Sequence, residues 1–424
     1  MNKIFKLMLI LPFFLFVLAS CSSDSETNNN AKIELDFWTL FGGGDLSFME
    51  EIVEEFNNSQ DEIVVNMPAI RNSDYYTKLV TSVAANRGPD VAIAHTSKIP
   101  ELNSRGLTEP IDDFAEEVGL DFNEFTKNLV EGTNLNGKHY GVPIDTHPFI
   151  MYVNNDLAAQ AGVLDENGNI IMEETPEGYI DFLLKIKKAL PDKIPLAISN
   201  AGADPFRMWW AFYFQMGGSP IYSGDLSSPD VTIDREIAIK AANYVRSLFH
   251  EHEIVPLNLA DFYQDFQTGR AVTMTTGVWA TGIWETTEGL DFTALPLPNL
   301  FEQKATWGDS HTLIMPIKEN TTREKQLAVV KFMDFVTDRG VDWAEAGHIP
   351  AKKSVVESQE FQDLPYRSDY AKVAEYVALP NKTAYGDMSK RVFEQNLDLA
   401  WTNRESTEKV IDTLIKDLEN LVKK

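Results

Sequence analysis

The sequence predicts an α/β protein with two lobes, each built around its own sheet. Strand and helix patterns alternate over residues 33–94, as they do in largely parallel sheets. The chain has 424 residues, 44% of them hydrophobic, and a chain of that size usually divides into two or three domains. Gly141 and Pro143 interrupt the chain just before a new apolar strand, which marks a candidate crossing between lobes.

The first lobe is expected to begin with the order β-α-β-α-β. Residues 33–38 (IELDFW) form a strand candidate, and a glycine-rich loop leads from it to a helix with one apolar stripe. The remaining elements are a strand at 63–67, a helix at 75–86 and a strand at 91–94. Ligands of open sheets collect beyond the carboxyl ends of the strands. This rule selects two candidate binding loops, at 38–45 and 95–98.

The second lobe is expected to start with an apolar strand at 149–153. Its predicted helices lie near residues 179–190, 206–216, 235–250 and 261–268. A Leu-Pro-Leu-Pro sequence at 295–298 marks a further junction. Between Val410 and Leu421 apolar residues recur with helical spacing, so the C-terminal segment is expected to be an amphipathic helix packed on the surface.

The first thirty residues are typical of a signal peptide followed by a tether. Lys3 and Lys6 precede an apolar run, Leu7 to Val17, that is too short to span a membrane. The only cysteine ends the sequence Leu18-Ala19-Ser20-Cys21, which resembles the lipobox of bacterial lipoproteins. We therefore expect residues 1–20 to be a signal peptide and Cys21 to carry the lipid. Residues 21–31 would be a flexible tether that holds the protein outside the cytoplasm, with lipid as its only contact with the membrane.

Composition and missing motifs exclude several classes of function. The formal charge of −27 would repel phosphate backbones, so nucleic acid is a poor partner. A single cysteine forms neither an internal disulfide nor a thiolate metal cluster. The segment that starts at Asp165 has the opening spacing of a calcium loop, but Ile170 stands where that loop needs glycine and Pro176 where it needs glutamate. The sequence His250-Glu-His-Glu lacks the histidine spacing of a zinc site. We expect no metal, no cofactor and, without a G-x-S-x-G elbow, no enzyme activity.

Five segments together carry a family resemblance. They are FWTLFGGGD with IVEEFNNS, YYTKLVTSVAANRGPDVAIAH, GKHYGVPIDTHPFIMYVNNDLAAQAGV, FQTGRAVTMTTGVWATG and VVKFMDFVTDRGVDWAEAGHIPAKKSV. In this order they resemble the family 1 extracellular solute-binding proteins of carbohydrate ABC importers, the group related to maltose-binding protein. The likeness covers nearly the whole chain.

The resemblance implies a type II periplasmic-binding-protein fold, in which the ligand lies in a cleft between two discontinuous lobes. It places the first crossing at 139–145, the return near Leu295 and a further crossing around 335–350. The first lobe would then contain residues 32–143 and 294–340, and the second lobe residues 144–293 and 341–424. The family also implies a permease partner that reads the closed form.

A sugar site needs flat aromatic surfaces for C–H faces and carboxylates or amides for hydroxyls. Trp38 ends a strand where the cleft should open, and Trp279 lies in a motif that comes close to the ligand in relatives. For Trp343, packing at the hinge is an alternative explanation, and any tryptophan can be a core residue. The candidate ligand-binding residues are Trp38, Phe41, Asp45, His95, Asp145, His147, Trp209, Trp279, Trp284, Asp309, His311 and Trp343.

These observations predict a monomeric substrate-binding lipoprotein that captures a mono- or oligosaccharide and delivers it to an ABC permease. Two alternatives stay open. One is a secreted carbohydrate-active enzyme on the same two-lobed scaffold. The other is a receptor for a non-sugar solute, such as a polyamine or a glycerol-phosphate compound. The selected loops lack the arginine cluster that phosphate would need, whereas a box of carboxylates and aromatic rings for a polyamine is compatible with the sequence.

Overall fold

The computed structural model describes residues 32–42, 44–68, 70 and 74–423. The predicted signal peptide at 1–20, the tether at 21–31 and the lipid site Cys21 lie outside the described residues. Within the described residues, no helix combines the length and the apolar character needed to cross a membrane.

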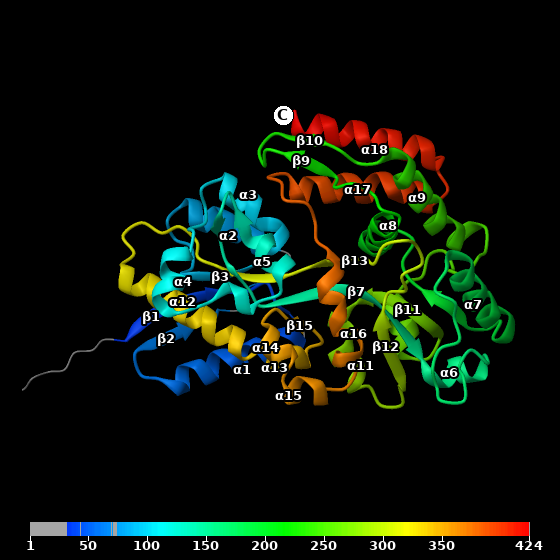
Figure 1. Ribbon diagram of the computed structural model, residues 1–424, viewed down its shortest axis with the longest axis horizontal. Coiled ribbons are helices and arrows are strands. Elements are labelled where there is room, and N and C mark those ends of the chain that lie inside the picture. The colour runs from blue at the N-terminus through cyan, green and yellow to red at the C-terminus, as the bar shows by residue number, and fades with distance from the viewer. Residues whose placement is uncertain (1–31, 43, 69, 71–73, 424) are drawn as a thin grey trace, which may run out of the picture.

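Two α/β lobes lie side by side, as the sequence predicts (Figure 1). The first lobe contains a sheet in the order β2-β1-β3-β14-β6, in which β1 runs parallel to β2 and β3. β14 is antiparallel to both of its neighbours. Only the first three strands therefore form the expected parallel sheet, because β6 and β14 belong to segments that connect with the other lobe. The strands are β1 (Ile33–Trp38), β2 (Ile63–Asn66), β3 (Val91–His95), β6 (Val142–Pro143) and β14 (His311–Ile314).

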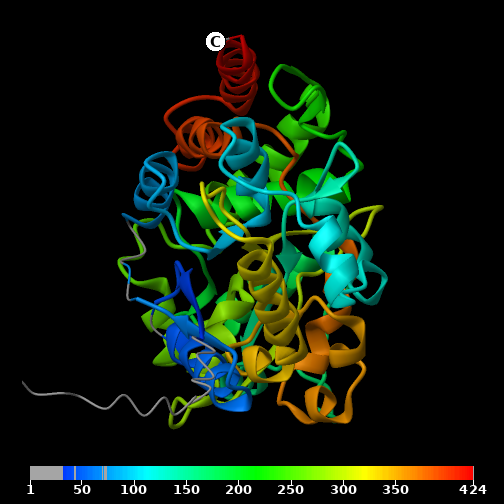
Figure 2. The same cartoon turned by 90° about the vertical axis from the view of Figure 1, so that its left-hand side faces the viewer.

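Helices cover the first sheet and bury its core. Phe332 of α12 lies edge-on to Phe37 of β1, with ring centroids 5.2 Å apart, and to Phe56 of α1 at 5.1 Å. Figure 2 shows this lobe nearest to the viewer, with α12 in front of the strands. The helices are α1 (Gly44–Ser59), α2 (Tyr75–Ala84), α3 (Ile99–Ser104), α4 (Asp112–Val118), α5 (Lys127–Thr133) and α12 (Arg323–Asp338), together with the 3-10 turn η2 (Thr96–Lys98).

The second sheet is organised around one long strand, β7 (Asp145–Asn154), every residue of which is buried. Alternate side chains of a strand point to opposite faces. Met151 and Val153 thus face one hydrophobic core, and Ile150 and Tyr152 face another, which explains the uninterrupted apolar sequence. The other strands are β8 (Ile194–Ala197), β11 (Ala271–Gly277), β12 (Phe292–Pro296), β13 (Thr306–Asp309), β15 (Ile349–Pro350) and β16 (Val377–Ala378).

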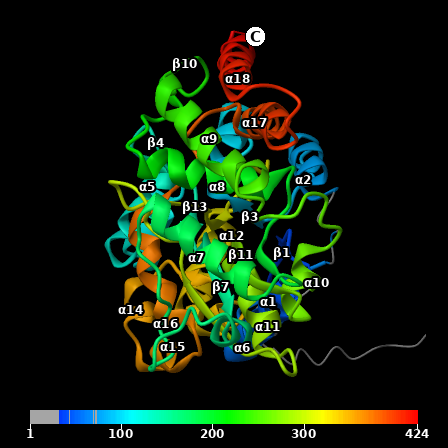
Figure 3. The same cartoon turned by 90° about the vertical axis from the view of Figure 1, so that its right-hand side faces the viewer.

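Two groups of helices enclose this sheet. Figure 3 shows α7, α8 and α9 on the outer side, with α17 and α18 above them. The predicted C-terminal helix is confirmed. Its apolar stripe, including Ile411 and Leu414, is buried in the core that also contains Met151 and Val153 of β7. The helices are α6 (Asn155–Gln160), α7 (Pro176–Ala189), α8 (Ala203–Gln215), α9 (Arg235–His250), α10 (Phe262–Gln267), α11 (Thr281–Glu285), α14 (Lys353–Val356), α15 (Gln359–Asp363), α16 (Arg367–Tyr370), α17 (Gly386–Trp401) and α18 (Thr407–Val422), with the 3-10 turn η4 (Val278–Ala280).

The chain passes between the two sheets at Ile144 and again at Ser310. The expected return near Leu295 is wrong, because β12 and β13 both pair with β7. Residues 294–309 therefore belong with the second sheet, and the prolines at 296 and 298 end a strand without marking a crossing. A second difference concerns Trp343 of α13 (Gly340–Glu345), which was expected in the second lobe but is buried in the core of the first.

Candidate functional site

A cavity of about 350 Å³ lies between the two sheets and is lined by residues from both lobes. Its volume falls within the range of small-molecule sites, which is about 300–1,000 Å³. The first lobe contributes Asp45 of α1, Tyr76 of α2, His311 of β14 and the segment His95, Ser97 and Lys98 that follows β3. The second lobe contributes His147 of β7, Phe206, Arg207 and Trp210 of α8, Tyr222 of β9 (Tyr222–Gly224), Trp279 of η4, Trp307 and Asp309 of β13, and residues of α17.

Several residues predicted from the sequence are brought together at this cavity. The residues that line it are Asp45, His95, His147, Trp279, Asp309 and His311. Asp45 and His95 come from the two loops selected at the carboxyl ends of β1 and β3. The strand-end rule therefore located the part of the first lobe that faces the cavity.

The remaining predicted residues lie elsewhere, and in each case packing is the reason. Trp209 stacks on Tyr213 at 5.2 Å and donates its indole N–H to the carbonyl of Ala238 in the second core. Trp284 is buried edge-on to Tyr152 at 4.8 Å. Trp38 packs at the rim of the first core, under the ammonium group of Lys78.

The last three predicted residues, Phe41, Asp145 and Trp343, form a layer behind the cavity wall. Phe41 contacts the rings of His311 and Trp343, at centroid distances of 4.9 and 4.7 Å. Trp343 in turn donates its indole N–H to Asp145, with Nε1 and Oδ2 2.7 Å apart. The side chain of Asp145 has no exposed area within the described structure. These three residues support the cavity-lining histidines and do not line the cavity themselves.

Sequence reasoning missed several residues that line the cavity: Tyr76, Arg207, Trp210, Tyr222 and His348. Trp209 and Trp210 show why. Neighbours on a helix point about 100° apart, so α8 buries Trp209 in the core and turns Trp210 toward the cavity. Trp307 carried a usable signal, because it stands two positions before Asp309 on the same strand and therefore shares its face.

One wall of the cavity combines two indole rings with a guanidinium group. The Arg207 guanidinium lies 4.4 Å from the ring centroid of Trp307 and 4.9 Å from that of Trp279. Asp204, one turn earlier on α8, holds it through an ion pair of 2.5 Å. Burial raises the pKa of the Asp204 carboxyl, and the charge of Arg207 opposes this rise. Trp279 is held in turn by a hydrogen bond from its indole N–H to the hydroxyl of Tyr263 at 2.9 Å, so both Trp279 and Arg207 have partners within the protein.

Other polar groups that line the cavity already have partners. The carboxylate of Asp309 accepts hydrogen bonds from the Ser97 hydroxyl at 2.5 Å and from the amide of Ser310 at 2.9 Å. Burial nevertheless raises the pKa of Asp309. His95 pairs through Nδ1 with the hydroxyl of Tyr76 at 2.7 Å, and burial lowers the pKa of this histidine well below its ordinary value.

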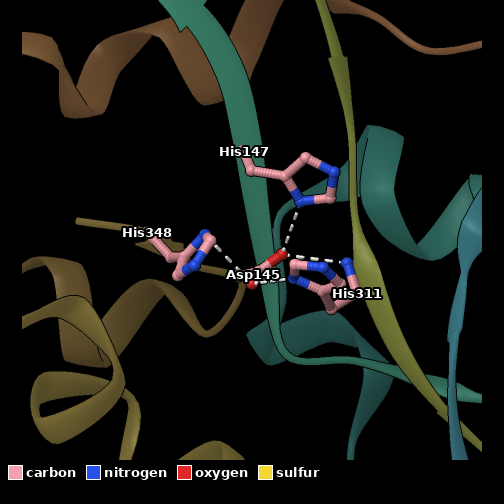
Figure 4. Close-up of side chains that lie close together, drawn as sticks. All are labelled: Asp145, His147, His311 and His348. Atoms are coloured by element: carbon pink, nitrogen blue, oxygen red, sulfur yellow. Dashed lines mark hydrogen bonds and ion pairs between the residues drawn. The ribbon is translucent and has the colours of Figure 1, made fainter. Parts of the chain in front are cut away.

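The floor of the cavity is a cluster of histidines around Asp145 (Figure 4). The Asp145 carboxylate accepts hydrogen bonds from His311 through both Nδ1, at 2.8 Å, and the backbone amide, at 2.9 Å. Burial alone would raise the pKa of Asp145, but His311, His348 and His147 together hold it well below its usual value. Burial lowers the pKa of His147 to about 3, which keeps this imidazole neutral at physiological pH.

Comparison with known proteins identifies the family. Residues 51–368 match the bacterial extracellular solute-binding proteins. The chain belongs to this family. The family is extracellular by its description, so this solute-binding protein acts outside the cytoplasm.

Curated relatives of this solute-binding protein include two arabinooligosaccharide-binding proteins. That of Bacillus subtilis (strain 168) is 22% identical over 294 residues, which cover 66% of this chain and 64% of the relative. That of Halalkalibacterium halodurans is 23% identical over 260 residues, covering 59% of this chain and 54% of the relative. The matches therefore span less than two thirds of the length of these relatives.

Solved structures share the fold at low sequence identity. The GacH receptor of Streptomyces glaucescens GLA.O, studied with acarbose, has a TM-score of 0.78 at 16% identity, covering 92% of this chain and 99% of that one. UgpB of Mycobacterium tuberculosis, in complex with glycerophosphocholine, has a TM-score of 0.77 at 18% identity, covering 92% and 98%. Similarity at this level shows that the solute-binding protein has the same two-lobed architecture.

Proposed function

We propose that the protein captures a mono- or oligosaccharide in the cavity between its lobes and delivers it to the permease of an ABC importer. The observation that carries this proposal is the composition of the cavity, in which aromatic rings and hydrogen-bonding side chains face the same space. Trp210, Trp279 and Trp307 provide surfaces for the C–H faces of a sugar ring. Asp45, Asp309 and the histidines offer donors and acceptors for its hydroxyl groups.

The relatives support a carbohydrate ligand. Two of them are named for arabinooligosaccharides and a third, from Rhizobium radiobacter, for lactose. A structural neighbour from Arthrobacter globiformis binds cyclic α-maltosyl-1,6-maltose. Ligands of this kind are neutral and rich in hydroxyl groups, which matches a wall of indole rings facing a polar floor.

Capture by closure follows from the origin of the lining residues. Because both lobes contribute side chains, a ligand in the cavity makes its full set of contacts only when the lobes are close together. The ligand thus shifts the population toward the closed form, and the permease would read that form. In this proposal the protein is a monomer, performs no chemistry on the sugar and uses no cofactor.

The decisive experiment is a calorimetric titration with arabino-oligosaccharides, malto-oligosaccharides, lactose and monosaccharides, together with glycerophosphocholine and a polyamine. Saturable binding of one sugar class, recovered unaltered after incubation, is the expected result. Conversion of the sugar would identify a carbohydrate-active enzyme instead. Binding of glycerophosphocholine or the polyamine alone would identify a receptor for a non-sugar solute.

We further propose that the mature protein is a lipoprotein anchored through Cys21, since this residue ends the lipobox-like sequence at 18–21. Acyl chains hold a protein on a membrane without spanning it. Cell fractionation tests the anchor. Wild-type protein should remain with the membrane, whereas Cys21→Ser should appear in the soluble extracytoplasmic fraction. Equal retention of both forms would contradict the proposal.

A further inference from the structure

Three histidines at the floor of the cavity and Asp145 directly behind them bring together four potential metal ligands from three separate parts of the sequence. Asp145 and His147 belong to β7, His311 begins β14, and His348 directly precedes β15. Each offers one ligand atom, and the four atoms all lie within 4.8 Å of one another. Their side chains converge on one small volume at the junction of the lobes (Figure 4).

The four ligand atoms surround one point but are spread more widely than in a closed tetrahedral site. The Nδ1 atoms of His311 and His348 lie 2.8 and 3.6 Å from Oδ2 of Asp145, and Nδ1 of His147 lies 3.4 Å from Oδ1 of the same carboxylate. Zinc bonds of about 2.0–2.1 Å to nitrogen and oxygen place neighbouring ligand atoms about 3.3 Å apart in a tetrahedron. A bound ion would therefore have to draw together ligand atoms that now lie within 4.8 Å of one another.

His348 provides an independent reason to expect an ion. The side chain is 1% exposed, and neither ring nitrogen has a hydrogen-bond partner among the described residues. Its Nε2 lies 3.4 Å from Asp45, and its ring stacks on Trp343 with centroids 4.7 Å apart. Buried polar atoms without partners cost free energy. A cation bound to Nδ1 would remove that cost on the side that faces Asp145.

The surroundings hold the cluster in place. Trp343 and the backbone amide of His311 each donate a hydrogen bond to the Asp145 carboxylate. Outer hydrogen bonds of this type orient the ligands of metal sites. His95 packs against the rings of His311 and His147, at 5.1 and 5.5 Å, but its own Nδ1 is engaged by Tyr76. The three ligand histidines also line the cavity, so an ion can reach them from solvent.

We propose that Asp145, His147, His311 and His348 bind a divalent transition-metal ion of the zinc class. Three imidazoles with one carboxylate suit zinc and its neighbours, whereas magnesium and calcium prefer oxygen ligands. The His311 imidazole would bind through Nδ1 with its proton on Nε2, giving up its hydrogen bond to Asp145. Since the ligands come from the segments where the two sheets meet, the ion would join the lobes at the hinge.

The test is a zinc titration of the purified full chain after treatment with a chelator. We expect one zinc ion per chain, with magnesium and calcium failing to compete. His348→Ala should weaken zinc binding at least about 100-fold. The matched controls are His139→Ala, a half-buried histidine paired with Asp112 outside the cavity, and His252→Ala in the surface His-Glu-His-Glu segment. Both controls should bind zinc as the wild type does.

A second measurement guards against misfolding. His348→Asn keeps a polar side chain of similar size, and circular dichroism shows whether each variant is folded. The visible absorption of bound Co²⁺ reports its coordination geometry, and the tetrahedral spectrum should disappear in both His348 variants. Absence of zinc binding in the wild type, or unchanged binding in a folded His348 variant, would overturn the proposal. Sugar titrations test the proposed function separately, so the two can fail independently.

Discussion

Trp279 and Trp284 are only five residues apart, but the structure assigns them different roles that mutation can separate. Trp284 is 2% exposed and lies among Tyr152, Phe266 and Phe292. A buried tryptophan removes about 150–250 Å² from water, worth about 4–6 kcal/mol. Truncations of this kind cost about 3–5 kcal/mol in practice, so we expect Trp284→Ala to lower the free energy of unfolding by about 4 kcal/mol.

The corresponding change in melting temperature follows from the length of the chain. For 424 residues the entropy of unfolding is about 0.9 kcal/mol/K, so a loss of 4 kcal/mol lowers the melting temperature by about 4–5 °C. Trp279 is only partly buried and lines the cavity. Trp279→Ala should therefore leave the melting temperature nearly unchanged, while weakening sugar binding by about 1–3 kcal/mol, or about 5- to 150-fold.

Differential scanning calorimetry and a titration with the sugar that binds best together measure both effects. Trp284→Ala that melts at the wild-type temperature would refute the placement of Trp284 in the core. Unchanged sugar affinity in Trp279→Ala would refute the assignment of that ring to the binding wall. A reversal of the two effects would mean that the segment after β11 has a different register.

Three further variants test the support of the cavity. A methyl group on Gly277 would lie 1.9 Å from the Trp279 ring, so Gly277→Ala should displace the indole. Calorimetry should then show sugar binding weakened about tenfold, and unchanged affinity would contradict the close packing of Gly277 against the Trp279 ring. Arg207→Ala leaves the Asp204 carboxylate without its ion pair and should lower the free energy of unfolding by about 3 kcal/mol near neutral pH. Since burial raises the pKa of Asp204, protonation in acid should remove most of this loss, and an equal loss at about pH 4 in denaturant titrations would contradict it. Gly347 has a φ of 112°, and a methyl group added there would lie 2.2 Å from the carbonyl oxygen of Val278. Gly347→Ala should therefore lower the melting temperature by several degrees, and an unchanged melting temperature would contradict this.

Local elements were predictable because their signals are local. Strand β1 spans the predicted residues 33–38, and helix α9 spans the predicted 235–250. In both cases hydrophobic periodicity and the flanking residues act within a few positions of each other. The return to the first lobe was misplaced because the sequence Leu295-Pro296-Leu297-Pro298 ends a strand whether or not the chain then crosses to the other lobe. Which sheet the following strand joins depends on pairing with β7, far away in the sequence.

Residues of the candidate site were predictable when they stand at the ends of strands, and they were missed when their position depends on how a helix is oriented. Asp45 and His95 stand at carboxyl ends of strands, a position that a topology rule selects without coordinates. Trp209 and Trp210 carry the same chemistry at adjacent positions, and only the docking of α8 decides which ring faces the cavity. Tyr222 and Arg207 offered no local signal at all.

By itself, the sequence determined the α/β class, the presence of two lobes and the family. The first two depend on hydrophobic periodicity and on interruptions by glycine and proline, and the family depends on short segments that each resemble the corresponding segment of its members. The tertiary structure alone decided that Asp145, His147, His311 and His348 meet at one point. These residues are separated by up to about two hundred positions, and only the pairing of β13 and β15 with β7, together with the crossing to β14, brings them together. Contacts between distant segments depend on how whole elements pack, which no short stretch of sequence encodes.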